Sequence, residues 1–342
     1  MRAGPLHNRG TSLVEGRIRV EYLYNYLAED FRAIDERLAE VHHGVEGRLM
    51  AEVAAYVGAG RGKLLRPAIV CLAARTLGYG DGPDEDFHIR LAAAVECFHV
   101  ASLLHDDVID KAPLRRGRET VNAKWGDDTA ILFSDYLYAS SFDLALSTLN
   151  PEALRVLTKT TQQMTKGEFL QIENRGAWLD VENYMEIIRC KTGYLFAASA
   201  SLGAVIAGAD RETIEKLGTF GLEFGTAFQI TDDTLDYEAQ MDRWGKRVGA
   251  DLAEGKQTLP LLHTLQSADD MDREALLKEL NNGRDFSTVQ RYVQKYDAID
   301  FSLDVASNHC RNAVAALEEF SPDNEAAGLL RQIAEGVLVR QF

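Results

Sequence analysis

The sequence predicts an all-α fold, and three observations support this prediction. Apolar residues recur at spacings of three and four, as in an amphipathic helix, and the N-terminal example comprises Val20, Leu23, Leu27, Phe31, Ile34, Leu38 and Val41. Runs rich in Val, Ile and Thr with alternating polarity, which are typical of strands, do not occur in the sequence. The chain has only seven prolines in 342 residues, and most of them stand beside turn or helix-start signals.

The helical pattern is interrupted by two predicted loops, Gly78–Asp86 and Gln266–Asp272. Neither loop is a long linker rich in Pro, Gly or Ser, so we expect residues 16–342 to form a single domain. Residues 1–10 lack the apolar core of a signal peptide. Residues 1–15 are therefore predicted to be a disordered leader.

One stretch, Thr192–Ala209, carries no charged residue for 18 positions, which reaches the lower limit for a membrane span. The stretch is rich in Gly, Ala and Ser, and the charged residues Lys191 and Asp210 bracket it closely. We therefore expect a helix buried inside a large helical protein, and no transmembrane segment.

The composition argues against several classes of function. A formal net charge of −16 argues against a nucleic-acid partner, because binding to the phosphate backbone needs a basic face. The four cysteines are far apart and form no Cys-x-x-Cys arrangement, so neither a disulfide framework nor a zinc site is indicated. This cysteine usage fits a reducing compartment, and we expect a cytoplasmic protein.

Two copies of the pattern Asp-Asp-x-x-Asp are the main chemical signal. Their residues are Asp106, Asp107, Asp110, Asp232, Asp233 and Asp236. A helix advances about 100° per residue, so each copy places three carboxylates on one face. Such a cluster is destabilising unless a cation lies among the groups, and hard oxygen ligands suit Mg²⁺. A solvated acidic helix face is the alternative for one copy, and a second copy argues against it.

Basic residues stand where an anion site would need them. They are Lys63, Arg66, Arg115 and Arg116. Arg offers forked, bidentate contacts to phosphate, while Lys offers a point charge. The alternative for the last two is a surface ion pair with a neighbouring acid, Asp110 or Glu119.

Further candidates lie beside the charge-free stretch and the acidic motifs. Lys191 and Thr192 stand at the start of the stretch, although Lys191 could simply snorkel from a buried helix. Lys246 and Lys256 follow the second motif, and either could be a solvated loop lysine. His99 lies two helical turns before the first motif on the same face, so its ring could point into the same cavity or have a structural role.

Taken together, these motifs resemble those of the trans-type polyprenyl diphosphate synthases. The matching segments are residues 62–67, 96–110, 115–117, 191–193, 228–236 and 245–260. The resemblance implies a single large helical bundle around a deep central cavity, usually a homodimer, with the two acidic motifs facing each other. It also implies magnesium-dependent, head-to-tail condensation of isopentenyl diphosphate with an allylic diphosphate.

The resemblance further implies a role for each candidate residue. Asp106, Asp110 and Asp232 would bind Mg²⁺, three ions with substrate present, and the other Asp residues of the motifs would support them. The allylic diphosphate would be bound by Arg115, Lys191 and Lys246, with Lys256 as a further substrate-binding candidate. Isopentenyl diphosphate would be bound by Lys63, Arg66, His99 and Arg116.

In the implied reaction, cations and basic side chains neutralise the charge on the departing pyrophosphate, which leaves an allylic carbocation. The alkene of isopentenyl diphosphate then attacks this carbocation, and the released pyrophosphate accepts the proton. Thr192 and Gln229 lie beside the reacting carbons in the family and could stabilise the carbocation with their dipoles. The expected catalytic residues are Lys191, Thr192, Gln229, Asp106 and Asp232.

Two positions depart from the family pattern. Leu64 stands where the family usually has Arg, and we expect at most a modest effect because Lys63 and Arg66 are present. Ser134 stands where Gly is common, and the sequence offers no interpretation of it.

Product length is predicted from the residues four and five positions before the first acidic motif, which form the floor of the product cavity in the family. Here they are Ser102 and Ala101, both small, so an apolar tail could extend past them towards Phe98. We expect a long product, C30–C50. Phe98 or a residue on another helix could instead close the tunnel, as in a short-chain farnesyl or geranylgeranyl diphosphate synthase.

Two other classes compete with this interpretation. A terpene cyclase would keep the first acidic motif but would not need the second motif, Lys63 or Arg66. A non-catalytic subunit of a heteromeric synthase should have lost acidic ligands, whereas all six aspartates are present.

Overall fold

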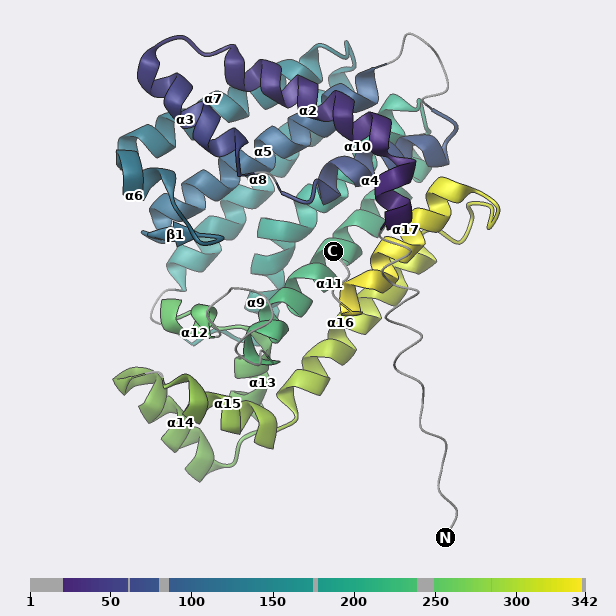
Figure 1. Ribbon diagram of the computed structural model, residues 1–342. Coiled ribbons are helices and arrows are strands. Elements are labelled where there is room, and N and C mark those ends of the chain that lie inside the picture. The colour runs from purple at the N-terminus through teal and green to yellow at the C-terminus, as the bar shows by residue number, and fades with distance from the viewer. Residues whose placement is uncertain are drawn as a thin grey trace.

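The structure is a computed structural model that describes residues 21–60, 62–79, 86–174, 178–238, 249–283 and 285–339. Within these residues the chain is almost entirely helical, which confirms the all-α prediction (Figure 1). The predicted leader, residues 1–15, lies outside the described residues, and so does most of the predicted loop 78–86.

The helices of the first half precede the charge-free stretch. They are α2 (Ala28–His43), α3 (Arg48–Gly58), α4 (Leu65–Thr76), α5 (Phe87–Ile109), α6 (Val121–Trp125), α7 (Asp127–Leu146), α8 (Pro151–Glu173) and α9 (Val181–Ile188). A π-helical turn, η1 (Arg189–Gly193), joins α9 to α10 (Tyr194–Ile206).

The second half begins with the longest helix, α11 (Arg211–Glu238). It continues with α12 (Ala250–Glu254), α13 (Leu259–Ser267), α14 (Asp270–Asn282), α15 (Phe286–Lys295), α16 (Ala298–Ala315), α17 (Glu325–Gly336) and the 3₁₀ turn η2 (Val337–Val339). In Figure 1, α14 and α15 lie at one end of the molecule and α2, α3 and α7 at the other, while α16 runs alongside α11.

The core is centred on α10, which packs against α4, α8 and α11. Most residues of α10 are buried, which confirms that the charge-free stretch belongs to a core helix. Glycines permit the closest contacts. A Cβ atom at Gly203 would lie 2.5 Å from the carbonyl oxygen of Val70, and one at Gly221 would lie 2.3 Å from that of Phe196. The helix backbones are therefore in direct contact at these two positions.

Among the described residues, one helix is long and apolar enough to cross a membrane by length and composition, and it is α5 rather than the charge-free stretch. The protein buries 67% of the apolar window of α5. Because other helices cover α5 along most of its length, this helix needs no continuous polar face. Its C-terminal end carries the first acidic motif.

A small hairpin between α5 and α6 was not predicted from the sequence. Its strands, β1 (Leu114–Arg115) and β2 (Arg118–Glu119), pair in antiparallel fashion. The two turn residues, Arg116 and Gly117, have φ angles of 51° and 75°, as a two-residue type I′ turn requires. The hairpin has only two residues in each strand, which is too short for the sequence to show strand periodicity.

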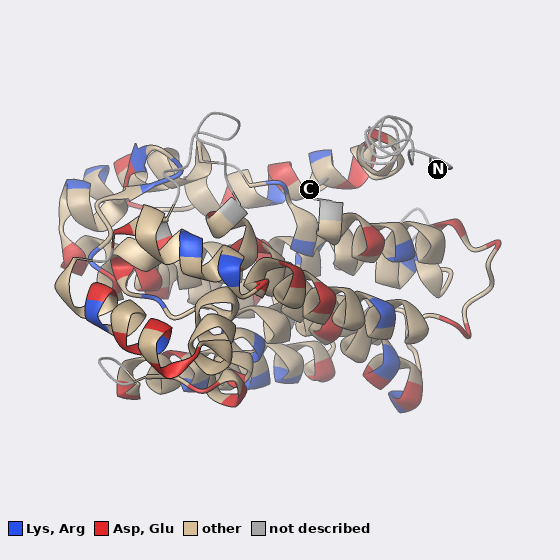
Figure 2. Cartoon of the chain, turned by 90° about the horizontal axis from the view of Figure 1, so that it is seen from below, with Lys and Arg blue, Asp and Glu red and all other residues tan. Residues whose placement is uncertain are grey.

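The distribution of charge agrees with the composition. Figure 2 shows acidic and basic residues interspersed over the described helices, without a continuous basic face. All four cysteines are buried and free, so the prediction that they form no disulfide framework is confirmed.

Candidate active site

The first acidic motif lies at the C-terminal end of α5. Asp106 and Asp107 are in its last turn and Asp110 is its C-cap, and no basic residue occupies this turn. The C-terminal end of a helix carries partial negative charge, so three carboxylates here are unfavourable unless cations compensate them. The second motif lies within the last two turns of α11, and the last turn of this helix also carries no basic residue. Both clusters therefore favour a bound cation.

Asp107 is already paired within the protein. Its side chain is buried, and both Nε and Nη2 of Arg115 lie 2.8 Å from its Oδ1 atom. Burial raises the pKa of Asp107, and Arg115 opposes this effect. The partner of Arg115 is thus neither of the two acids that the sequence offered, and the pair holds the hairpin against α5.

Glu168 of α8 adjoins the first motif, although it was not among the candidates predicted from the sequence. It lies within hydrogen-bond reach of Asp106, and burial and the charge of Asp106 raise its pKa to about 7 while Lys191 opposes this effect. The Nζ atom of Lys191 lies 2.6 Å from Oε1 of Glu168 and donates to Oε1 of Gln171 at 2.9 Å. A Glu and a Gln three residues apart on a helix were the available sequence signal.

Lys191 and Thr192 are both in the π-helical turn η1. A π-turn inserts one residue into a helix and is common at functional sites. The turn packs closely against α8 and α11 because glycines stand at the points of contact. A Cβ atom at Gly167 of α8 would lie 2.7 Å from Cβ of Cys190, and one at Gly193 would lie 3.0 Å from Cδ1 of Leu222.

Thr192 connects this turn to the second acidic motif. Its hydroxyl donates to Oε1 of Gln229 at 2.8 Å, and Nε2 of Gln229 donates to Oδ1 of Asp233 at 2.7 Å. The hydroxyl of Tyr184 donates to Oδ2 of Asp233 at 2.6 Å. Two consecutive residues of η1 thus reach different motifs. Lys191 contacts Glu168, which adjoins the first motif, and Thr192 contacts Gln229, which adjoins the second.

The remaining aspartates of the second motif differ in their surroundings. Asp232 is half-buried, whereas Asp236 accepts the backbone N–H groups of Gly249 and Asp251 at 3.2 and 3.1 Å, at the start of α12. Burial, Asp251 and Asp232 raise the pKa of Asp233 to about 7, although Tyr184 and Gln229 oppose this effect. The second cluster therefore has more negative charge than its own side chains neutralise.

Lys256 is influenced by acidic residues from two parts of the site. Its Nζ atom is 3.4 Å from Oδ1 of Asp251 and 2.7 Å from Oε2 of Glu254. Burial lowers the pKa of Lys256, but Asp251, Glu254 and Asp110 together raise it above the usual value. One ammonium group is thus influenced by both acidic ends of the site. The other loop lysine predicted from the sequence, Lys246, lies outside the described residues.

Three of the four residues assigned to isopentenyl diphosphate lie close together: Arg66 and Arg116 interact with a buried acid, Glu96, and His99 lies near both guanidinium groups. Burial, opposed by Glu96, lowers the pKa of Arg66 to about 10, and Arg116 adds to this effect. Burial, Arg66 and Arg116 lower the pKa of His99. A Cβ atom at Gly62 would lie 3.5 Å from Oε1 of Glu96 and 3.6 Å from Nη1 of Arg116.

The group of basic residues around Glu96 is suited to an anion. The guanidinium of Arg66 lies over the ring of Phe196, 4.2 Å from its centre, and its buried Nε atom has no hydrogen-bond partner among the described residues. Two guanidinium groups around one carboxylate leave a net positive charge in a partly desolvated place. Lys63 is exposed beside this cluster, and its carbonyl accepts the hydroxyl of Tyr24 at 2.9 Å.

The strip of α5 assigned to product length is covered by an aromatic residue of α7. The centre of the Tyr138 ring lies 4.8 Å from that of Phe98 and 5.6 Å from that of His105. Tyr138 therefore spans the helix turn that contains Ala101 and Ser102. Ala101 and Phe98 are fully buried. Ser134, for which the sequence offered no interpretation, donates its hydroxyl to the carbonyl of Ala101 at 2.7 Å and so ties α7 to this turn.

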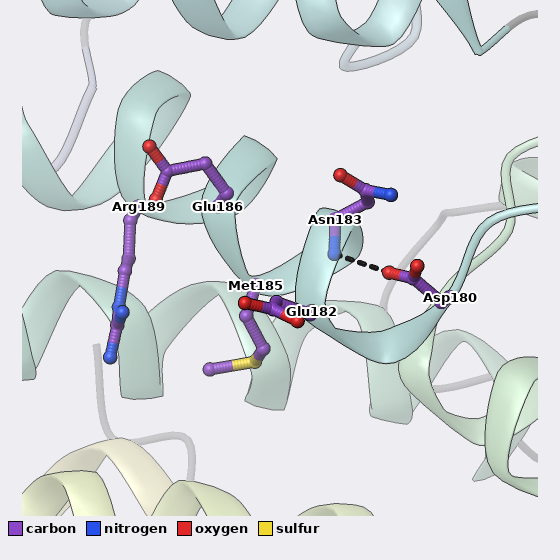
Figure 3. Close-up of a pocket in the computed structure, with 6 residues that line it drawn as sticks. All are labelled: Asp180, Glu182, Asn183, Met185, Glu186 and Arg189. Atoms are coloured by element: carbon purple, nitrogen blue, oxygen red, sulfur yellow. Dashed lines mark hydrogen bonds between the residues drawn. The ribbon is translucent and has the colours of Figure 1, made fainter.

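A pocket of about 270 Å³ lies elsewhere, on α9 (Figure 3). Its lining residues are Asp180, Glu182, Asn183, Met185, Glu186 and Arg189. Asp180 caps α9 by accepting the backbone N–H of Asn183 at 2.7 Å. None of the predicted site residues contributes to this pocket, and we do not assign it to the active site.

The residues present fit divalent cations. Beside the first acidic motif, burial and a neighbouring carboxylate raise the pKa of Glu168 to about 7, and in the second motif they raise that of Asp233 to about 7. A bound cation would reverse both shifts. Among the described residues, no three His, Cys, Asp or Glu side chains are close enough to hold an ion by themselves. Mg²⁺ usually completes its coordination with water and substrate phosphates, so the motifs need to supply only part of the shell.

Comparison with known proteins agrees with this geometry. The polyprenyl synthetase family model matches residues 47–299. Component 2 of heptaprenyl diphosphate synthase from Geobacillus stearothermophilus is 36% identical over 93% of this chain and 98% of that protein. A Caulobacter crescentus polyprenyl synthase, solved with calcium and isoprenyl diphosphate, has a TM-score of 0.86 and 34% identity, covering 94% of this chain and 98% of its own.

A geranylgeranyl pyrophosphate synthetase from Pyrococcus horikoshii also matches, with a TM-score of 0.84, 32% identity and coverage of 94% of this chain and 99% of its own. Fold, site and comparisons together define an all-helical prenyltransferase. The chain belongs to the polyprenyl synthetase family, whose members act on isoprenyl diphosphates and generally depend on divalent metals. It makes trans-polyprenyl diphosphates.

Proposed function

We propose that this enzyme condenses isopentenyl diphosphate with an allylic diphosphate in a Mg²⁺-dependent reaction. The observation that carries the proposal is the position of η1, whose consecutive residues Lys191 and Thr192 contact the neighbours of the two acidic motifs. A diphosphate between the motifs would lie next to the ammonium of Lys191. The allylic carbons attached to it would lie next to the hydroxyl of Thr192.

Each group of residues has a distinct task in the proposed reaction. Asp106, Asp110 and Asp232 would hold Mg²⁺, and the bound cation would supply charge that neutralises the departing pyrophosphate. Lys191, held in position by Glu168 and Gln171, donates to the diphosphate, and Lys256 adds charge from the other side. The dipoles of Thr192 and Gln229 stabilise the allylic carbocation. No protein base is required, because the released pyrophosphate can accept the proton.

Isopentenyl diphosphate is proposed to bind at the cluster around Glu96. Arg66 and Arg116 supply bidentate contacts, and His99 and Lys63 complete the anion site. Burial and the adjacent guanidinium groups keep His99 neutral, so it would donate a hydrogen bond without adding charge. The type I′ hairpin directs Arg115 to Asp107 and leaves its neighbour Arg116 at the cluster around Glu96.

The direct test is incubation with labelled isopentenyl diphosphate, farnesyl or geranyl diphosphate and Mg²⁺, followed by sizing of the prenyl product. We expect elongation that stops when EDTA is added and resumes with excess Mg²⁺. Elongation that continues undiminished in EDTA would refute the role of the acidic motifs. Cyclic hydrocarbons formed without isopentenyl diphosphate would instead indicate a terpene cyclase.

A long product, C30–C50, is proposed because Ala101 and Ser102 are small. Relatives of both long and short product length match this chain, so similarity alone does not select the length. The bulk that ends the product tunnel would come from Phe98, one helix turn beyond Ser102, and from Tyr138, whose ring packs on Phe98 and spans the turn of Ser102. A long tail would require these rings to move aside. The alternative, a short product, corresponds to the rings staying in contact.

A homodimer is proposed to form through α7 and α8. These consecutive helices pack against each other and expose large apolar side chains, among them Leu132 (69% exposed), Leu146 (56%) and Phe169 (60%). Large apolar side chains that two neighbouring helices expose are candidates for an interaction surface. Light scattering should give twice the mass of the chain, and Leu132→Glu combined with Phe169→Glu should give the monomer mass. A monomeric parent would contradict the proposal.

A heteromeric enzyme is the second arrangement to consider, because the Geobacillus relative is named as component 2 of its synthase. Activity of the purified chain alone would exclude a requirement for another component. We further propose that residues 16–342 act as one domain in the cytoplasm, which the four free, buried cysteines support.

A further inference from the structure

Tyr184, Asp233, Gln229 and Thr192 form one continuous chain of hydrogen bonds from α9 to η1. The chain runs through contacts of 2.6, 2.7 and 2.8 Å and is buried at the tyrosine end, where Tyr184 and Asp233 are 3% and 6% exposed. Only Thr192 and Gln229 were singled out from the sequence as groups near the reacting carbons. Tyr184 stands outside every family motif described above.

The direction of each hydrogen bond follows from the groups involved. A tyrosine hydroxyl and a glutamine NH₂ both donate to Asp233, so the carboxylate uses both oxygens as acceptors. This fixes the amide of Gln229 with its oxygen towards Thr192, whose hydroxyl proton is directed at that oxygen. The lone pairs of the Thr192 hydroxyl are then the part left for an adjacent cation.

We propose that Tyr184 is a positioning residue for the ionisation step, acting through Asp233 and Gln229 on the hydroxyl of Thr192. This inference rests on the proposed function of the site. It also assigns Asp233 a different task from the other aspartates of its motif, because both of its oxygens are engaged by protein donors. Without the tyrosine hydroxyl, the buried carboxylate lacks a donor and no longer holds the amide of Gln229 in one orientation.

The principal variant is Tyr184→Phe, which keeps the ring and removes only the hydroxyl. We expect kcat to fall about tenfold, the effect of losing one charge-assisted hydrogen bond. KM for both diphosphates and the Mg²⁺ concentration at half-maximal activity should be unchanged, because Tyr184 contacts neither Lys191 nor the first motif. A merely structural loss would also lower the apparent kcat at unchanged KM, because it reduces the fraction of active enzyme. The kcat is therefore expressed per folded enzyme, and the double-mutant cycle below separates the two causes.

The matched control is Tyr136→Phe. The hydroxyl of Tyr136 is partly buried and donates to the carbonyl of Val41 at 2.8 Å. Tyr136 lies on α7, away from this chain of hydrogen bonds. This variant should lose thermal stability and keep kcat. An equal fall of kcat in both variants would overturn the proposal.

A double-mutant cycle tests whether Tyr184 acts through Thr192. Thr192→Val removes the last donor of the chain, so adding Tyr184→Phe should lower kcat less than twofold further. Independent effects would multiply instead, and a full tenfold further loss would overturn the proposal. Tyr136→Phe combined with Thr192→Val serves as the additive control.

A second variant covers the case in which Tyr184→Phe does not fold. Asp233→Asn keeps the side-chain shape and one acceptor, and we expect it to lower kcat without raising the Mg²⁺ requirement. A raised Mg²⁺ requirement would show that Asp233 is a metal ligand and overturn the inference. Failure of the parent enzyme to elongate any substrate would instead refute the proposed function, so the two results are distinguishable.

Discussion

At the scale of single residues, Glu168 contributes a carboxyl group to the site in the absence of substrate. It lies between Asp106 and Lys191, and its pKa is raised to about 7 by burial and by Asp106. A carboxyl group in this place attracts a cation and holds the ammonium of Lys191 in position. Both effects should aid binding of the metal and the allylic diphosphate.

Glu168→Gln should therefore raise KM for the allylic diphosphate and the Mg²⁺ requirement, each about threefold to tenfold, because one charge-assisted contact to Lys191 is lost. Steady-state kinetics at several Mg²⁺ concentrations would measure both. Glu186→Gln is the matched control, since Glu186 pairs with Lys166 at 2.6 Å between α8 and α9, on a more exposed part of the surface. Unchanged constants in Glu168→Gln would contradict the proposed role.

At the scale of elements, the contact between α5 and α7 is proposed to set product length. Ala101→Tyr should shorten the main product, because a ring would fill the turn that Tyr138 covers. Tyr138→Ala should lengthen it by removing one of the two rings beyond Ser102. Product sizing under one set of substrate ratios checks both variants. If neither changes the length, the tunnel ends at another part of the molecule.

The contact between α10 and α11 should be intolerant of added atoms. Gly221→Ala would place a Cβ atom 2.3 Å from the carbonyl oxygen of Phe196, so the helices must move apart, at a cost of about 1–3 kcal/mol in the free energy of unfolding. Gly328→Ala on α17 is the control, because no other element of the described structure comes within 4 Å of the added group. It should gain up to about 1 kcal/mol from helix propensity. Denaturant unfolding of both variants tests this difference.

At the scale of the whole molecule, α11 is connected to α16 through Glu223. This carboxylate accepts from Asn312 at 3.1 Å and lies 2.6 Å from Nδ1 of His309, with Arg189 of η1 nearby. Burial raises its pKa, but the hydrogen bonds from His309 and Asn312 outweigh burial and leave the pKa lowered. A lowered pKa in the folded state stabilises the protein above the unfolded value and loses that stabilisation as the pH falls.

Glu223→Gln should therefore lower Tm near neutral pH, and the difference from the parent should narrow as the pH falls below 4.5, the ordinary value for this group. Thermal unfolding across a series of pH values measures the gap. Glu212→Gln on the same helix is the control, because Glu212 forms only an exposed pair with Lys216. A gap that stays constant with pH would show that charge at Glu223 is not responsible.

The sequence was sufficient where periodicity and spacing carry the information. The stripes of apolar residues predicted the helices, and the absence of charge in Thr192–Ala209 predicted the burial of α10, because each depends only on neighbours along the chain. The two Asp-Asp-x-x-Asp motifs were equally visible, and their spacing alone placed three carboxylates on one helix face. The assignment of individual site residues remains a prediction.

The tertiary structure decided which side chains meet across helices. It paired Arg115 with Asp107, brought Glu168 to Asp106, and connected Tyr184 to Thr192 through two residues of α11. These contacts join positions on separate elements, whose packing and register no local pattern encodes. The sequence by itself thus determined which groups carry the charge, and the packing of the helices determined which partners orient them, because hydrogen bonds and ion pairs depend on distance in space.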